Sequence, residues 1–148
     1  MSTRINISSG AKWEDIVGYS RAVRIGNVIE VAGTTAVDEH GQVVGSGDSG
    51  EQTKFILSKI EKALHAAGAT LNDVIRTRMF VTNIADWEAI GRSHGLYFKD
   101  IKPVATMVEV RSLISPELLV EIEVTAILRT CVRITSRFWN SSRSYSSD

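Results

Sequence analysis

The sequence has little cysteine and no excess of charge of either sign. Cys131 is the single cysteine among 148 residues, which excludes an internal disulfide and any cysteine cage for zinc or an iron–sulfur cluster. Lysine plus arginine and aspartate plus glutamate number 17 each, so the formal net charge is zero. Proteins that bind nucleic acid or anionic membranes are commonly basic, and we therefore expect neither partner.

Long apolar runs are also missing. No stretch approaches the roughly 20 apolar residues that cross a bilayer, and the N-terminal segment MSTRINISSGAKWE is too polar for a secretory signal. These features predict a cytoplasmic protein in a reducing setting. The composition that remains, 43% hydrophobic and 23% charged, is ordinary for one globular domain. The three histidines are scattered along the chain, so we expect no metal site.

The first half of the chain carries signals for a hairpin, a loop and a helix. Residues 21–26 and 27–36 predict the hairpin, because Gly26-Asn27 is a turn signal and VIEVAG is typical of a strand. The glycine-rich stretch 37–50 predicts a loop. An apolar stripe at helical spacing follows, formed by Ile56, Ile60, Ala63, Leu64 and Ala67.

The ends of this helix have recognisable caps. Asp48 or Ser49 can cap its N-terminus, and Ser49 with Gln52 has the spacing of a capping box. Gly68 stands where a left-handed C-terminal cap is expected.

The second half alternates between strands and a second helix. Residues 74–84 predict a strand; residues 86–99 predict a helix that packs through Trp87, Ile90, His94 and Tyr97. Residues 105–113 and 119–129 predict two closing strands joined as a hairpin by a proline-bearing turn. Trp13 is expected to be a packing residue like Trp87.

The resulting order, β-β-α-β-α-β-β, predicts an α+β fold with two helices on one face of a mixed sheet. No element of the chain is left to cover the other face. An apolar sheet face cannot stay exposed to water, so we expect self-association through it, with a site at the subunit boundary.

The last strand places carboxylates among apolar residues. Val120, Ile122, Val124 and Ala126 alternate with Glu121, Glu123 and Thr125 and should face the opposite side of the sheet from them. A carboxylate on a mostly buried sheet is costly unless it is paired. This strand is therefore either a surface edge or the floor of a site.

Three segments resemble the RidA (YjgF-type) reactive-intermediate deaminase family. They read GYSRAVRIGNVIEVAGTTA, RTRMFVTNIADWEAI and PVATMVEVRSLISPELLVEIEVTAI, and the resemblance covers about residues 13–129. It implies a chorismate-mutase-like fold, a homotrimer with clefts between subunits, and a small-molecule ligand in those clefts. It also implies hydrolysis of enamines or imines to carbonyl compounds and ammonia, without a cofactor.

The resemblance assigns roles to particular residues. Tyr19 and Gly33 would line the pocket, and the carboxylate of Glu121 would position the attacking water. The family's substrate-gripping arginine corresponds to Ala105, in the sequence Pro103-Val104-Ala105, and a frequent cysteine corresponds to Met107. Alanine offers neither charge nor donor, so we expect poor turnover of free 2-imino acids.

Other charged groups have two interpretations each. Arg76 and Arg78 are a replacement anion grip or are paired with carboxylates on neighbouring strands; the same choice applies to Arg21, Arg24 and Arg111. His94 is a general base or a packing residue. Arg92 and His94 lie on the helix that borders the cleft in the family, so both are candidate substrate-binding residues.

Two functional hypotheses follow. The first is an enamine or imine hydrolase of altered specificity, in which Ala105 and Met107 leave a wider, more apolar pocket. The alternative is a non-catalytic trimeric module that binds a metabolite or a protein, which the loss of the arginine favours. Residues 1–130 are expected to form a single domain, and the serine- and arginine-rich residues 131–148 are expected to be a tail that is disordered or does not belong to the family fold.

Overall fold

The computed structural model describes residues 2–129, so the expected tail at 131–148 and Cys131 lie outside the described residues. The elements are β1 (Arg4–Ile7), α1 (Lys12–Val17), β2 (Ala22–Ile25), β3 (Val28–Thr35), α2 (Ser49–Ala66), η1 (Leu71–Asp73), β4 (Val74–Val81), η2 (Ile84–Asp86), α3 (Trp87–Phe98), β5 (Val104–Glu109) and β6 (Val120–Ile127). The predicted order is confirmed from β2 to β6. The strand β1 and the short helix α1 precede it and were not predicted.

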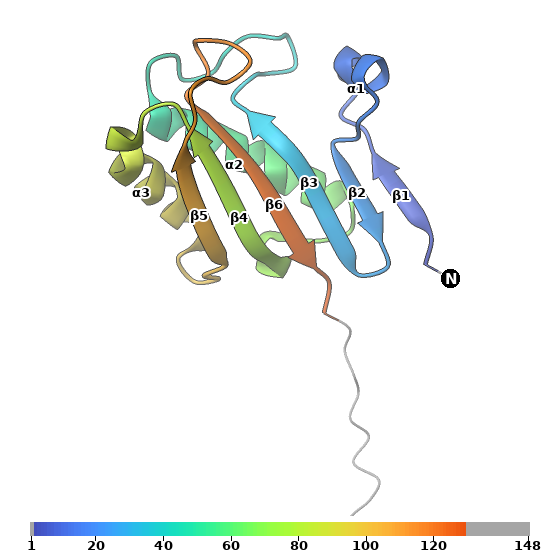
Figure 1. The fold of residues 1–148 in the computed structure, drawn as a ribbon. Coiled ribbons are helices and arrows are strands. Elements are labelled where there is room, and N and C mark those ends of the chain that lie inside the picture. Colours follow the sequence, from blue (N-terminus) through green and yellow to red (C-terminus); the bar gives the residue numbers. More distant parts are fainter. Residues whose placement is uncertain (1, 130–148) are drawn as a thin grey trace, which may run out of the picture.

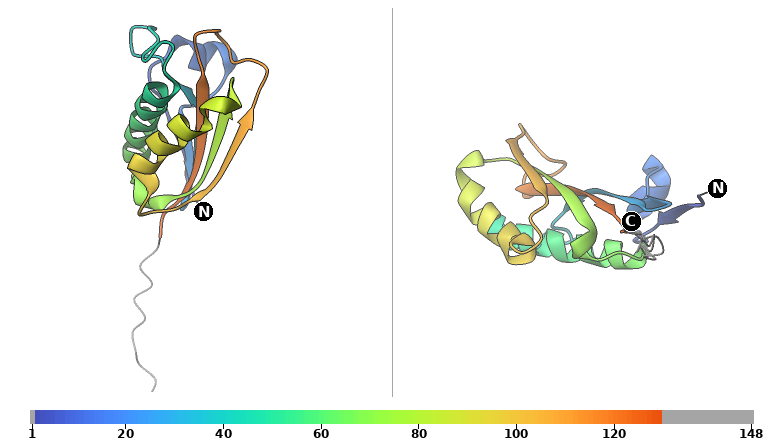
Figure 2. Two further views of the ribbon diagram at one scale, coloured as in Figure 1. Left: turned by 90° about the vertical axis from the view of Figure 1, so that its left-hand side faces the viewer. Right: turned by 90° about the horizontal axis from the view of Figure 1, so that it is seen from below.

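The strands form one mixed sheet in the order β1-β2-β3-β6-β4-β5 (Figure 1). Only β4 and β5 pair in parallel; the other neighbours are antiparallel. Helices α2 and α3 lie together against one face of the sheet, as predicted (Figure 2). We call the opposite face, seen from the front in Figure 1, the open face.

The prediction of a closing hairpin is wrong. Strands β5 and β6 do not pair, because β4 lies between them and pairs with both. Helix α3 carries the chain from β4 across to β5, which then lies parallel at the edge of the sheet. The last strand returns to the gap between β3 and β4. Its position therefore depends on pairing between segments far apart in the sequence.

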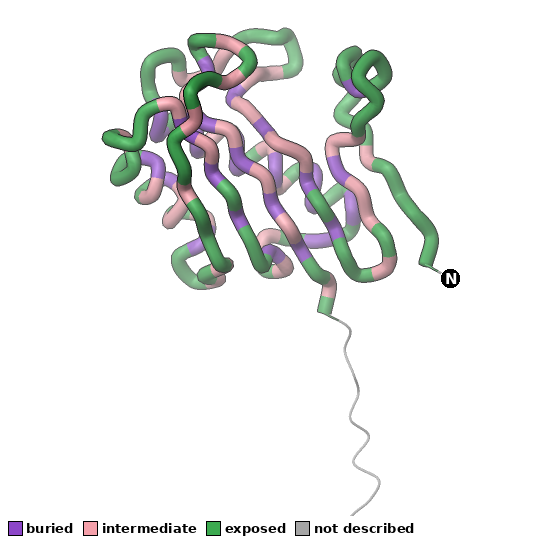
Figure 3. Tube along the Cα trace, viewed as in Figure 1, coloured by how far each residue is buried: buried purple, intermediate pink, exposed green. Residues whose placement is uncertain are grey.

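The predicted alternation along β6 is confirmed. Val120, Ile122, Val124 and Ala126 are almost fully buried beneath the helices, whereas Glu121, Glu123 and Thr125 are partly exposed on the open face (Figure 3). The buried row packs in the same cluster as the α2 stripe, including Ile56, Ile60 and Leu64. One side of β6 therefore belongs to the core and leaves the other available for chemistry.

The N-terminus of α2 differs from the predicted capping box. Asp48 is the cap, and its side chain accepts a hydrogen bond from Glu51 N. The amide of Gln52 is fully buried; it donates to the carbonyls of Gly45 and Glu117 and accepts from Leu119 N, at 3.2, 2.9 and 2.8 Å. The Gln52 side chain, which the pattern assigned to a capping box, thus binds three backbone groups instead. At the other end, Gly68 takes the predicted left-handed conformation, with φ +86°.

The two tryptophans predicted to pack are exposed instead. Trp13 on α1 and Trp87 on α3 are 56% and 60% exposed. The buried side of α3 begins only at Ile90, one turn after Trp87, and continues through Ser93 to Phe98. The first turn of α3 therefore extends beyond the surface that the core covers.

Candidate functional site

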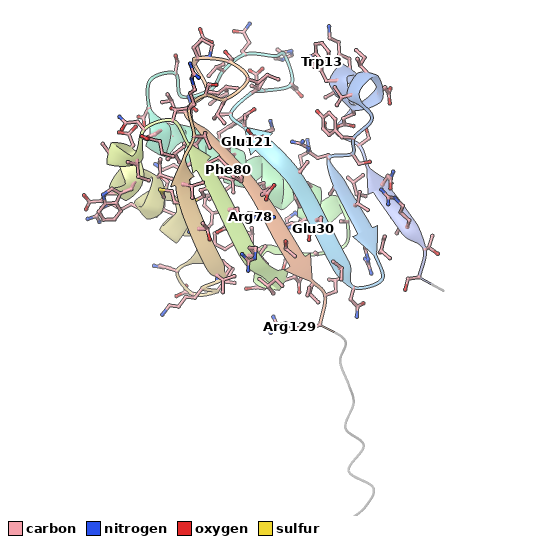
Figure 4. All side chains as sticks on the ribbon, in the orientation of Figure 1. Trp13, Glu30, Arg78, Phe80, Glu121 and Arg129 are labelled. Carbon is pink, nitrogen blue, oxygen red and sulfur yellow. The ribbon has the colours of Figure 1, made fainter. Side chains whose placement is uncertain are left out.

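Glu121 lies on the open face in the upper part of β6 (Figure 4). Its carboxylate is half-buried, yet within residues 2–129 it forms no hydrogen bond and no ion pair within 4.0 Å. Burial raises the pKa of Glu121, and the nearby Glu123 carboxylate raises it further, while the Arg21 guanidinium opposes both effects. An incompletely compensated carboxyl group of this kind can exchange protons closer to neutral pH than an ordinary glutamate.

Gly33 provides the space for this carboxylate. The pairing of β3 with β6 skips from Val31 to Thr34, so a β-bulge contains Ala32 and Gly33. A Cβ built on Gly33 would lie 2.3 Å from Glu121 Oε1. Any side chain at this position would displace the carboxylate, which explains physically why glycine is found here.

Arg21 and Tyr19 approach the same bulge from the segment before β2. Arg21 Nη2 donates to the Gly33 carbonyl and Nη1 donates to Thr34 Oγ1, both at 3.2 Å. The guanidinium carbon is 5.8 Å from the centre of the Tyr19 ring. Two of the predicted site residues, Gly33 and Glu121, are therefore in contact, and Tyr19 joins them through Arg21.

Lys59 on α2 contributes a second cation that sequence reasoning missed. Its Nζ donates to the carbonyls of Thr35 and Val37, at 3.0 and 2.7 Å. Burial, together with repulsion from Arg21 and against the attraction of Asp38, lowers the pKa of Lys59 to about 8. The helical stripe marked the face of α2 that packs, but the spacing alone could not indicate which carbonyls a lysine would reach.

A groove of about 770 Å³ lies on the open face beside this cluster, between α1 and strands β1–β3. Tyr19 and Ala32 line it, together with four carboxylates, from Glu14, Asp15, Glu30 and Glu123. Glu121 and Gly33 are not part of its lining. They lie just beyond its rim, since Ala32 precedes Gly33 and Glu123 follows Glu121 by two residues on the same side of β6.

The remaining predicted residues form a separate group on the helix side. Ala105 and Met107 are paired with Thr77 and Met79, which are buried beneath the helices. His94 Nε2 lies 2.9 Å from Thr77 Oγ1, and burial lowers the pKa of His94. These contacts agree with the packing interpretation of His94. Within one chain the sheet separates this group from Glu121.

Two of the candidate arginines are paired with carboxylates. Arg78 Nε lies 2.6 Å from Glu123 Oε1, which is the cross-strand pairing considered for it. Arg92, a predicted substrate-binding residue, is 2.8 Å from Glu88 one turn earlier on α3 and is well exposed. With such charges, the open face is more polar than the strand sequences alone indicated.

The described residues hold no group of three or more histidine, cysteine, aspartate or glutamate side chains placed to share a metal ion. Among those same residues, no helix is both long enough and apolar enough to span a membrane.

The sheet, the helices on one face and the acidic residue on the other define a class of small α+β proteins. The family model described as Endoribonuclease L-PSP matches residues 10–128, and the chain belongs to this family, which includes the YjgF-type proteins. The crystal structure of Rv2704 from Mycobacterium tuberculosis, a member of the YjgF/YER057c/UK114 family, is 49% identical. That comparison covers 85% of this chain and all of the other, with a TM-score of 0.77.

Two relatives show the range of descriptions in the family. The uncharacterized protein SCO2049 from Streptomyces coelicolor is 38% identical over 120 residues, which is 81% of this chain and 89% of that protein. The 3-aminoacrylate deaminase RutC from Acinetobacter baylyi is 35% identical over 104 residues, which is 70% of this chain and 82% of that protein.

Proposed function

We propose that the protein hydrolyses the C=N bond of a small enamine or imine, releasing ammonia and a carbonyl compound. The half-buried carboxylate of Glu121, which has room to act because residue 33 is glycine, is the observation that carries this proposal. The name of the Acinetobacter relative, a 3-aminoacrylate deaminase, supports the same reaction type.

The reaction needs only water and proton transfer. An enamine that gains a proton from solvent at carbon becomes an iminium ion. Glu121 accepts a proton from water as the oxygen bonds to the iminium carbon, which gives a tetrahedral amino alcohol. The carboxyl group then returns a proton to the nitrogen, the C–N bond breaks to release ammonia, and loss of the hydroxyl proton to solvent leaves the carbonyl product. A raised pKa suits a group that must both accept and donate a proton.

The complete site requires a second copy of the chain. Tyr19, Gly33 and Glu121 lie on one side of the sheet, whereas Ala105 and Met107 lie at its far edge on the other side. We infer a homotrimer in which the two groups meet across a subunit boundary, with a small-molecule ligand between them. Light scattering of the purified protein tests this assembly, and a monomer would contradict it.

Charge argues against an RNA substrate, which the family description suggests. The groove beside Glu121 is lined by four carboxylates and one arginine, Arg4, and its negative balance would repel a phosphate backbone. The alternative function, a non-catalytic metabolite- or protein-binding module, is favoured by Ala105, because alanine cannot replace the charge-assisted contact of an arginine.

Glu121→Gln separates the hydrolase from the binding module. Imines and enamines generated in situ by an amino-acid oxidase serve as substrates, and ammonia release above the spontaneous rate is measured. We expect the substitution to lower kcat about 100-fold or more, the usual contribution of a positioned acid–base group. Glu30→Gln is the matched control, because Glu30 lies on the open face and accepts a hydrogen bond from Thr125. Equal rates for Glu121→Gln and the wild type would refute the hydrolase proposal.

A further inference from the structure

Arg21 is the cation closest in the fold to the Gly33 bulge. Its backbone carbonyl accepts from Ala32 N, so Arg21 extends the β2–β3 pairing by one residue beyond Ala22 and Val31. By strand alternation, its Cβ shares the open face with Val23, while its guanidinium turns toward the end of β3, where it reaches the Gly33 carbonyl and the buried Thr34 hydroxyl. Glu121 lies on this same face.

Arg21 has no anionic partner in the described part of the chain. Its two described side-chain acceptors, the Gly33 carbonyl and Thr34 Oγ1, are both neutral. Among residues 2–129, no carboxylate oxygen lies within 4.0 Å of its nitrogens, and Nε is buried without an acceptor. A guanidinium carries five N–H donors, so several remain for another group.

The charge around Arg21 leaves room for an anion. Lys59 lies close enough for Arg21 to depress its pKa, and Lys59 itself binds only backbone carbonyls. The Glu121 carboxylate also lies beside Gly33, likewise without a direct partner among the described residues. Arg21 and Glu121 thus approach the same glycine without contacting each other. This arrangement suits a small molecule whose two ends carry opposite charges.

We propose that Arg21 is the anion-binding group of this site and receives the carboxylate of a small enamine or imine acid, while Glu121 faces the carbon that bears nitrogen. This inference rests on the proposed function and makes it more specific. The charge missing at Ala105 is then supplied from the segment before β2, beside the Gly33 bulge. The iminium nitrogen, which is positive, lies toward Glu121, and the negative end of the substrate lies toward Arg21.

Three of the other arginines considered for this role bind other groups. Arg78 and Arg92 are paired with Glu123 and Glu88. Arg24 donates to the carbonyls of Gly26 and Ala67, the latter at the end of α2 on the helix side.

The test measures binding without turnover. The probe is 2-oxobutanoate, a stable acid that resembles a hydrolysis product, and butanone is its neutral counterpart. Calorimetric titration of the intact protein should show that 2-oxobutanoate binds at least 10-fold more tightly than butanone. Arg21→Gln should remove this preference by weakening acid binding about 10- to 100-fold. Arg21→Lys should retain part of it, because the charge remains but the two-pronged geometry is lost.

Lys54→Gln is the matched control, because it removes an exposed cation whose partner, Glu51, lies one turn away on its own helix. Its acid binding should equal that of the wild type. A second measurement on the wild type needs no folded variant: the ¹⁵N resonance of Arg21 Nε should shift on addition of 2-oxobutanoate and not of butanone.

Several results would overturn the inference: no preference for the acid in the wild type, unchanged acid binding in Arg21→Gln, or saturable acid binding that leaves the Nε resonance in place. The two proposals can fail separately. Acid binding through Arg21 without any imine hydrolysis would remove the proposed function and leave the anion site. Glu121-dependent hydrolysis that ignores Arg21 would do the reverse.

Discussion

Gly33→Ala is a sharp test of the site because the added methyl group would meet the Glu121 side chain. An ideal Cβ at residue 33 would lie 2.3 Å from Glu121 Oε1 and 3.1 Å from its carboxyl carbon. Ordinary van der Waals contact begins at 3.4 Å, so the carboxylate would have to move by about 1 Å. The backbone conformation of residue 33 is open to alanine, since Gly33 is not among the residues with positive φ.

The magnitudes separate an effect on activity from an effect on stability. A misplacement of about 1 Å at a reacting group can lower the rate about 100-fold. Holding the Glu121 side chain away from its preferred rotamer costs about 0.5–1.5 kcal/mol. Replacing glycine by alanine within a strand returns about 0.5–1 kcal/mol of backbone entropy. We therefore expect a large loss of imine hydrolysis and a free energy of unfolding within about 1 kcal/mol of the wild type.

The assay combines ammonia release from imines generated in situ with urea unfolding of the same preparation. Gly95→Ala on α3 is the control, because a Cβ there meets nothing within 4 Å. This control should keep full activity and gain up to about 1 kcal/mol from helix propensity. If Gly33→Ala kept wild-type activity, or if it unfolded the protein instead, the idea that Gly33 acts by making room for Glu121 would be wrong.

Three further predictions concern single substitutions. Ala105→Arg should raise kcat/KM for 2-iminobutanoate at least 10-fold by adding a charge-assisted contact; no gain would show that this position does not border the substrate. Burial lowers the pKa of His94 in the folded chain, so the unfolded chain binds more protons and stability should fall as pH drops below about 6.5. In urea unfolding at pH 7.5 and 5.5, His94→Gln should show a smaller loss, and an unchanged loss would contradict the assignment. Asp48→Ala should lower the free energy of unfolding by about 1 kcal/mol by removing the cap of α2. The control is Asp86→Ala, which removes a cap without a side-chain hydrogen bond and should change stability by less than about 0.5 kcal/mol. Equal losses in the two variants would refute the capping argument.

Local patterns predicted the elements that depend on neighbouring residues. The Gly26-Asn27 turn fixes the β2–β3 hairpin, and the two-residue period of β6 places Glu121 on the face away from the helices. The same period cannot identify a partner strand. The closing strands were therefore expected to pair with each other, whereas β4 lies between them.

The N-terminal elements were missed because their signal is short and their support is tertiary. Strand β1 has four residues, and α1 has six. The buried carboxylate of Glu14 holds the segment together by accepting hydrogen bonds from Ser8 Oγ and Ser9 N, at 2.6 and 3.0 Å. No periodicity reveals such a contact in advance.

The arginine beside the site also depended on tertiary structure. The sequence offered several arginines with equal claims. Only the folded chain distinguishes Arg78, which is paired with Glu123, from Arg21, which reaches the Gly33 bulge. A long side chain can cover several neighbouring positions, so its partners follow from the bulge and the strand register rather than from spacing.

The buried amide of Gln52 has a consequence for motion near the site. One side chain joins Gly45, before α2, to Glu117 and Leu119, before β6. If either segment opened alone, buried polar groups of the other would lose their hydrogen-bond partners. The two segments should therefore open together. Amide hydrogen exchange at Leu119 should therefore follow the opening of the first turn of α2. The chain that leads into β6, two residues before Glu121, would then behave as a rigid frame, and new substrates would have to be accommodated by exchanged side chains rather than by movement of this segment alone.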